Sequence, residues 1–133
     1  MKKIADSGLI IAALDAGDTF HRWAVNLLQR EEPPWLVCES VLAEISASIG
    51  TAEPVLEMLK IGDLQLAFDL DAEKLTVLAL IKKYRDRKMD LADACVVRMS
   101  ELFPDAVVFT VDKTDFSVYR RHGNRTIKCV FPA

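Results

Sequence analysis

Five acidic residues stand where their carboxylates could share a metal ion. Asp6 follows a short apolar run, Asp112 follows a β-branched run, and Glu44, Asp90 and Asp93 fall in segments with helical spacing. Carboxylates gathered in one site repel one another unless a divalent cation lies between them. Oxygen ligands without histidine or cysteine select Mg²⁺ or Mn²⁺ over zinc. The chemistry that these residues favour is metal-assisted hydrolysis of phosphodiester bonds.

The elements that carry these acids place them toward one edge of a sheet. In open α/β sheets, sites form beyond the carboxyl ends of the parallel strands, and Asp6 and Asp112 both follow strands. At roughly 100° per residue, Asp90 and Asp93 lie about 60° apart on one helix face. Glu44 borders the apolar stripe of its own helix, so it can point into a cleft.

Strands alternate with helices along the whole chain. This alternation predicts a three-layer α/β/α sandwich with a mainly parallel central sheet. The predicted strands are Lys3–Ala5, Trp35–Cys38, Leu64–Phe68, Ala106–Val111 and Thr126–Val130. The predicted helices cover Leu9–Leu14, a segment from Phe20 through Leu28 that ends before Pro33, Ser40–Ile49, Pro54–Lys60, Leu75 toward Arg85, Asp90–Phe103 and Phe116–Arg120.

Each acid also has a plain structural role open to it. Asp6 could cap the helix after it, and Asp90 has the position of an N-cap with an acid three residues on, similar to a capping box. Glu44 alone would be a solvated surface residue. Asp112 could be a turn residue, and Asp115 could cap the next short helix. The argument for a site depends on several acids arriving in matching contexts.

Size and composition favour one globular unit. The chain has 133 residues, of which 51% are hydrophobic and 28% charged, so it can bury a core without disulfides. We expect a single domain over residues 1–133. The apolar run Leu9–Leu14 is too short for a secretory signal or a membrane span, so we expect a cytoplasmic protein with no membrane partner.

The cysteines and histidines offer no metal-ligand spacing. Cys38, Cys95 and Cys129 are odd in number and sit inside apolar runs, so we predict reduced cysteines in the core. His21 and His122 have no ligand-type neighbours in the sequence, and we predict surface positions for both.

The charge balance is compatible with a nucleic-acid partner. Net charge is −3 from 17 basic and 20 acidic residues, but five acids in a cation site would leave 15 acids against the 17 bases. Two basic segments, 82–88 and 120–125, could contact phosphates or could be solvated surface. The candidates for contact with an RNA backbone are Arg85, Arg87, Lys88, Arg120 and Arg121.

Four short segments resemble a known family. They are Ile4–Gly8, Glu39–Glu44, Met89–Ala94 and Thr110–Asp112, the last followed by Asp115-Phe116. Each is weak alone, but in their order and spacing they are similar to PIN-domain proteins, specifically the VapC-like toxin ribonucleases of toxin–antitoxin pairs. The resemblance covers essentially the whole chain.

The resemblance implies a site and an activity. Asp6, Glu44, Asp93 and Asp112 match the family's acidic quartet, which cleaves RNA with Mg²⁺ or Mn²⁺; Asp90 is a possible further ligand. Asp6 and Asp93 would be the core ligands. Thr110 and Ser7 would support the site, and either Asp112, which we favour, or Asp115 would be the distal acid. The family's toxins usually form homodimers and are inhibited by a small antitoxin that binds DNA.

Two other functions compete with this interpretation. Phosphoryl transfer to an aspartate also places an Asp after the first strand, but Asp6-Ser7-Gly8 has neither the Asp-x-Asp nor the acidic pair that such enzymes need. The second is a PIN-like module that binds RNA or protein without cleavage. Retention of all four quartet acids argues against it.

Overall fold

Five short parallel strands form the central sheet. The computed structural model describes residues 1–133, and the strands run in the order β3-β2-β1-β4-β7. All neighbouring pairs are parallel, which confirms the predicted sheet. The strands are β1 (Lys3–Ala5), β2 (Trp35–Val37), β3 (Leu64–Leu66), β4 (Val107–Phe109) and β7 (Cys129–Val130).

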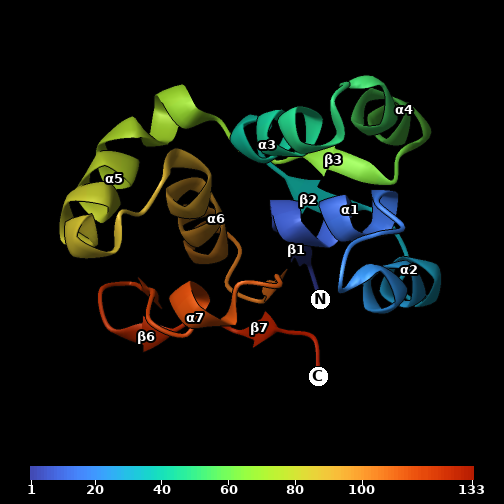
Figure 1. Cartoon of the computed structure of the whole chain (residues 1–133). Coiled ribbons are helices and arrows are strands. Elements are labelled where there is room, and N and C mark those ends of the chain that lie inside the picture. The colour runs from blue at the N-terminus through green and yellow to red at the C-terminus, as the bar shows by residue number, and fades with distance from the viewer.

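Helices cover both faces of this sheet. The first four lie on one side, and α5 and α6 lie on the other (Figure 1). The architecture is therefore the predicted three-layer α/β/α sandwich. The helices are α1 (Ser7–Leu14), α2 (His21–Arg30), α3 (Glu39–Ile49), α4 (Glu53–Ile61), α5 (Leu70–Lys83), α6 (Leu91–Leu102) and α7 (Lys113–Phe116), with a 3₁₀ turn η1 (Arg85–Arg87).

Alternating side chains of the strands tie the layers together. Trp35 packs edge-on against Phe109, with ring centroids 4.9 Å apart. It also lies near Leu28 of α2 and Met58 of α4 around a small cavity. Residues one position along a strand point to the opposite face, where α6 contacts β1 and β4. Both faces of the central strands are buried, as continuous apolar runs predict.

The last thirty residues differ from two of the predictions. The short helix predicted over Phe116–Arg120 is wrong, because α7 ends at Phe116 and Arg120–Arg121 form strand β5. The single strand predicted over Thr126–Val130 is also wrong. Arg125–Thr126 form β6, which pairs antiparallel with β5, whereas Cys129–Val130 form β7 of the main sheet. Residues 127 and 128 connect β6 to β7, and the side chain of Ile127 is buried.

The carboxyl ends of β1 and β4 lie side by side. The backbone N–H of Asp6 donates to the carbonyl oxygen of Phe109 at 3.1 Å, so the segments after these strands begin together. Gly8 in the first turn of α1 lies against Val111, and a Cβ at Gly8 would be 2.4 Å from Val111 Cγ2. This close approach is possible because Gly8 has no side chain.

The helices and cysteines complete the comparison with the sequence. None of the helices combines the length and apolar character that crossing a membrane requires. All three cysteines are free; Cys38 and Cys95 are buried as predicted, while Cys129 is only partly buried at the edge strand.

Candidate metal centre

Asp6 is held in the core at the end of β1. Asp6 is 5% exposed. Its two carboxylate oxygens accept hydrogen bonds from different donors. Oδ1 accepts from the backbone N–H of Ser7 at 2.9 Å, and Oδ2 accepts from the Thr110 hydroxyl at 2.7 Å. Thr110 itself is fully buried. Asp6 therefore joins the ends of β1 and β4, and it caps α1 as one of the sequence alternatives predicted.

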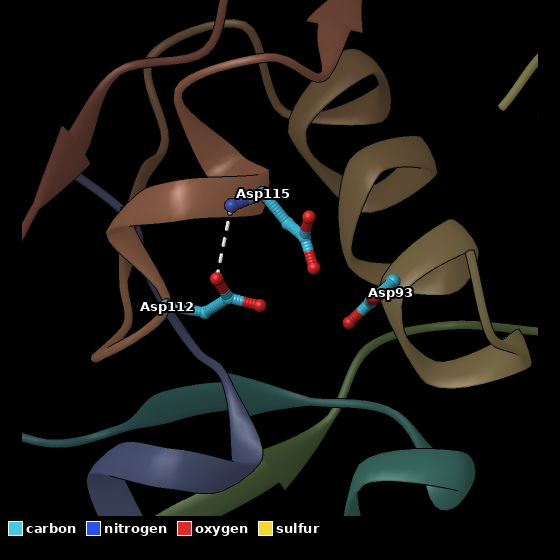
Figure 2. A group of neighbouring side chains, drawn as sticks. All are labelled: Asp93, Asp112 and Asp115. Atoms are coloured by element: carbon cyan, nitrogen blue, oxygen red, sulfur yellow. Dashed lines mark hydrogen bonds between the residues drawn. The ribbon is translucent and has the colours of Figure 1, made fainter. Parts of the chain in front are cut away.

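Three carboxylates gather beside Asp6. Asp93, Asp112 and Asp115, here called the aspartate cluster, each offer an oxygen within 4.8 Å of the others. Figure 2 shows their side chains pointing toward one another from α6 and from the segment around α7. All three are partly buried. The sequence left Asp112 and Asp115 as alternatives for the distal acid, and the fold brings both to the cluster.

The start of α7 positions Asp112 and Asp115. Asp112 is the N-cap, and its Oδ1 accepts from the backbone N–H of Asp115 at 2.9 Å (Figure 2). The backbone N–H of Asp112 donates in turn to Thr110 Oγ1 at 3.0 Å. Thr110 thus connects Asp6 to Asp112. A capped turn fixes two acids three residues apart, although the helix it begins is only four residues long.

The start of α6 positions Asp93. Asp90 is the N-cap, and its Oδ1 accepts from the backbone N–H of Asp93 at 2.8 Å. The predicted capping role of Asp90 is confirmed by this contact. Asp93 Oδ2 accepts from the hydroxyl of Tyr119 at 2.9 Å. Tyr119 is a contact that sequence reasoning missed, because the two residues are 26 positions apart and no spacing rule joins them.

Glu44 of α3 lies beside the start of α6. It lines a cavity of about 290 Å³ together with Asp90. Burial and then the charges of Asp90 and Asp6 raise the pKa of Glu44. Glu44 is outside the close group of three oxygens but faces the same acidic region.

The pKa values of the quartet acids reflect this crowding. Burial is the largest cause that raises the pKa of Asp6, Glu44 and Asp112, and neighbouring carboxylates raise each of them further. For Asp93, burial and then the charge of Asp90 raise the pKa to about 7, against an opposing contribution from the Tyr119 hydrogen bond. A divalent cation among these groups would favour their charged forms.

Arg87 is the basic residue in direct contact with the aspartate cluster. It donates through Nε and Nη2 to Asp115 Oδ1 at 3.2 and 3.0 Å. Lys83 Nζ donates to the carbonyl oxygen of Gly123 at 2.6 Å. The two basic segments of the sequence, 82–88 and 120–125, therefore lie against each other beside the acids.

The other RNA-backbone candidates have different surroundings. Arg85 and Lys88 are exposed. Arg120 Nη1 donates to the backbone carbonyls of residues 117–119, which closes the turn after α7. Arg121 is 6% exposed, and its Nη1 donates to the carbonyl oxygen of Pro104 at 3.3 Å. The guanidinium groups of Arg120 and Arg121 are thus used within the fold.

The aspartate cluster has the donor set of a hard-cation site. One oxygen of each carboxylate accepts from a protein donor: Tyr119 for Asp93, the Asp115 backbone for Asp112, and Arg87 for Asp115. The second oxygen of each has no N–H or O–H donor. A group of three carboxylates, each with one oxygen within 4.8 Å of the others and with no nitrogen or sulfur ligand, fits Mg²⁺ or Mn²⁺ better than zinc.

Comparison with known proteins shows similarity to a ribonuclease. The chain is 27% identical over 126 residues to Ribonuclease VapC26 of Mycobacterium tuberculosis, and the alignment covers 90% of this chain and 93% of that protein. No model of a known protein family matches the chain. The similarity extends over nearly the full length of both chains.

Proposed function

We propose that this protein is a metal-dependent endoribonuclease and the toxin of a toxin–antitoxin pair. The observation that carries the proposal is the aspartate cluster, whose three carboxylates each place an oxygen within 4.8 Å of the others at the carboxyl edge of a parallel sheet. Similarity to a ribonuclease over 90% of the chain supports RNA as the substrate. The proposed nuclease unit spans residues 1–133.

In this proposal Asp93, Asp112 and Asp115 hold Mg²⁺ or Mn²⁺. A bound ion would polarise the phosphate and make hydroxide available near neutral pH. Asp6 supplies negative charge next to the cluster and fixes Thr110, which orients Asp112. In this proposal Glu44, beside Asp90 at the start of α6, orients a water or completes the ligand set. Asp6 and Glu44 thus act with the cluster as the site's acidic frame.

The basic surface beside the acids would hold the substrate. Arg87 lies at the cluster, and its contact with Asp115 keeps a guanidinium next to the place where a phosphate would bind. Exposed Arg85 and Lys88 continue this surface away from the site. Phosphate contacts of this kind give affinity without reading sequence. The preferred RNA sequence is therefore set elsewhere on the surface.

Cleavage of an RNA panel in EDTA, Mg²⁺ or Mn²⁺ tests the activity. We expect cleavage by the wild type only with a divalent cation, and a loss of more than roughly 100-fold in Asp93→Asn, since even outer-shell partners of metals cost 10–100-fold. Asp71→Asn is the matched control, because Asp71 is an exposed acid of α5 that pairs only with Lys74. It should cleave like the wild type.

Two results would reject the activity. Cleavage that persists in EDTA, or equal activity in Asp93→Asn, would show that the acids do not act through a metal. Binding of RNA without cleavage in any cation would instead favour the non-catalytic RNA-binding module.

Expression in a bacterial host tests the toxin role. Induction of the wild-type chain should arrest growth, and Asp93→Asn should not. Co-expression of a short protein encoded beside it should restore growth and co-purify with the chain as the antitoxin. A homodimer is part of the proposal, and light scattering of the purified chain at two concentrations measures it. Normal growth during wild-type expression at confirmed protein levels would remove the toxin role while leaving the nuclease intact.

A further inference from the structure

Tyr119 forms a partly buried hydrogen bond with Asp93, one of the three carboxylates of the aspartate cluster. The Tyr119 hydroxyl donates to Asp93 Oδ2 at 2.9 Å. Tyr119 is fully buried, at 0% exposure, so its hydroxyl cannot reach a substrate. Its ring lies edge-on to Tyr84 and to Phe116, with centroids 5.0 and 5.1 Å away. A ring packed on two sides leaves the hydroxyl little freedom to move.

We propose that Tyr119 is a positioning residue that orients Asp93 for binding a divalent cation. This inference rests on the proposed function, because it assumes that the aspartate cluster holds the ion. The hydrogen bond to Oδ2 restricts rotation of the Asp93 carboxylate, which has an oxygen within 4.8 Å of Asp112 and Asp115. Hydrogen bonds of this kind to metal-ligating groups set ligand orientation and metal affinity.

One segment of the chain thereby controls all three carboxylates. Asp112 and Asp115 begin α7, and the backbone N–H of Tyr119 donates to the Asp115 carbonyl oxygen at 3.0 Å. Residues 112–119 supply Asp112 and Asp115 directly, and the Tyr119 hydroxyl of the same segment holds Asp93 on α6. The separation between Asp93 and the α7 acids is thus set by the position of Tyr119 as well as by the packing of the helices.

Tyr84 provides a matched comparison within the same aromatic group. Its hydroxyl accepts from the backbone N–H of Arg120 at 2.8 Å and touches no carboxylate of the cluster. Removing either hydroxyl deletes one oxygen and one hydrogen bond from a buried aromatic pair. Only the removal from Tyr119 changes a contact to a proposed ligand.

The test is Mn²⁺ binding by RNA-free protein, measured from the electron paramagnetic resonance signal of free Mn²⁺. We expect Tyr119→Phe to raise the Kd for Mn²⁺ by roughly 10-fold, the lower end of outer-shell effects on metal affinity. Tyr84→Phe should bind like the wild type. The Tm without metal should fall by similar amounts in the two variants. Saturating Mn²⁺ should restore RNA cleavage by Tyr119→Phe, because the ligands themselves are intact.

A packing control separates orientation from general loosening. Phe116→Leu weakens the same aromatic packing and keeps both hydroxyls. If it lowers Mn²⁺ affinity as much as Tyr119→Phe at a comparable loss of Tm, the effect comes from packing and the proposal is overturned.

The remaining outcomes distinguish this inference from the proposed function. If the wild type binds Mn²⁺, Asp93→Asn does not, and Tyr119→Phe binds like the wild type, the positioning role is wrong and the metal site stands. If the wild type shows no saturable Mn²⁺ binding, the proposed function fails and the positioning role fails with it.

Discussion

Asp6 and the aspartate cluster differ in how many of their carboxylate oxygens accept hydrogen bonds from the protein. Asp6 is buried, and both of its oxygens accept hydrogen bonds, from Ser7 and Thr110. The aspartate cluster is only partly buried, and each of its carboxylates keeps one oxygen without a protein donor. Asp6 is therefore satisfied by the fold itself, whereas the cluster brings together three carboxylates with one protein cation, Arg87, and a bound metal ion would relieve the remaining repulsion.

This difference separates a structural role from a binding role among similar residues. A saturated buried carboxylate mainly connects segments, and its loss should be felt as lost stability. An unsatisfied, crowded carboxylate costs stability in the metal-free protein and contributes to metal affinity. Stability and metal affinity should then respond in opposite directions when the contacts of Asp6 and the aspartate cluster are altered.

The largest effect should come from Asp112→Asn. The amide oxygen can still cap α7, but one negative charge leaves the cluster, so we expect the Kd for Mn²⁺ to rise roughly 100-fold, the upper end of outer-shell effects. The metal-free protein should gain about 1 kcal/mol, the repulsion of two unit charges 4 Å apart in a water-like dielectric. Calorimetric titration and urea unfolding measure the two quantities. A variant that is less stable and binds metal normally would reverse the assignment.

Thr110→Val should lower stability strongly and change metal affinity only weakly. Removing the hydroxyl leaves Asp6 Oδ2 without its donor in the core, which should cost about 1–3 kcal/mol of unfolding free energy. The Kd for Mn²⁺ should rise no more than roughly 10-fold, because Thr110 touches Asp112 only through its backbone N–H. Thr110→Ser keeps the hydroxyl and is the control. Equal stability of the valine and serine variants would show that the Asp6 contact contributes little.

The pH dependence of stability tests the crowding around Asp93. Burial raises its pKa to about 7, whereas an unfolded Asp titrates near pH 4. Between these values the native state binds more protons than the unfolded chain, so the unfolding free energy of metal-free protein should fall as pH rises through this window. Above it the dependence should level off.

Thermal unfolding in EDTA from pH 4.5 to 8 measures this slope. The slope should be shallower in Asp93→Asn, which has no charge to form at that position. Saturating Mn²⁺ at the upper end of the range should recover stability in the wild type. A Tm that rises across the same range, with no difference in Asp93→Asn, would contradict the prediction.

The smallest effect should come from Arg87→Gln. Arg87 is about one-third exposed and pairs with Asp115, so removing its charge should tighten Mn²⁺ binding only about 2- to 5-fold, the range of an exposed ion pair. If Arg87 also contacts a phosphate, the salt dependence of RNA binding should lose about 0.7 in slope. Arg22→Gln, on an exposed position of α2, is the control. An unchanged slope would remove Arg87 from the RNA contacts.

Local sequence patterns predicted most of the fold because the main elements follow local rules. The apolar runs became β1, β2, β3 and β4, and the Asp90 cap formed as its spacing indicates. The predictions that failed concern Phe116–Arg120 and Thr126–Val130. There the chain is shaped by distant contacts: the Tyr84 hydroxyl accepts from the backbone of Arg120, and β7 pairs with β4.

In the candidate site, too, local features were predicted from the sequence and those set by distant contacts were not. Sequence position predicted that Asp6 and Asp112 both follow strands of the parallel sheet, since strand ends are a local property; that the two strands are neighbours comes from the structure. It could not choose between Asp112 and Asp115, because that depends on how the α7 turn is capped. The sequence could not predict the role of Tyr119, since its partner Asp93 lies on α6, 26 residues earlier in the chain. The roles of these residues in metal binding and cleavage stay predictions.

The close approach of Gly8 to Val111 has a consequence for how this protein tolerates change. A single added methyl group at Gly8 would meet Val111 Cγ2 at 2.4 Å, and both segments lead directly into the acidic region. Relief of that clash requires a rearrangement of the Val111 side chain or a shift of the start of α1 or of the connection between β4 and α7, and a shift of about 1 Å is large enough to impair a catalytic arrangement. A residue with no functional group of its own can therefore be as intolerant of substitution as the acids.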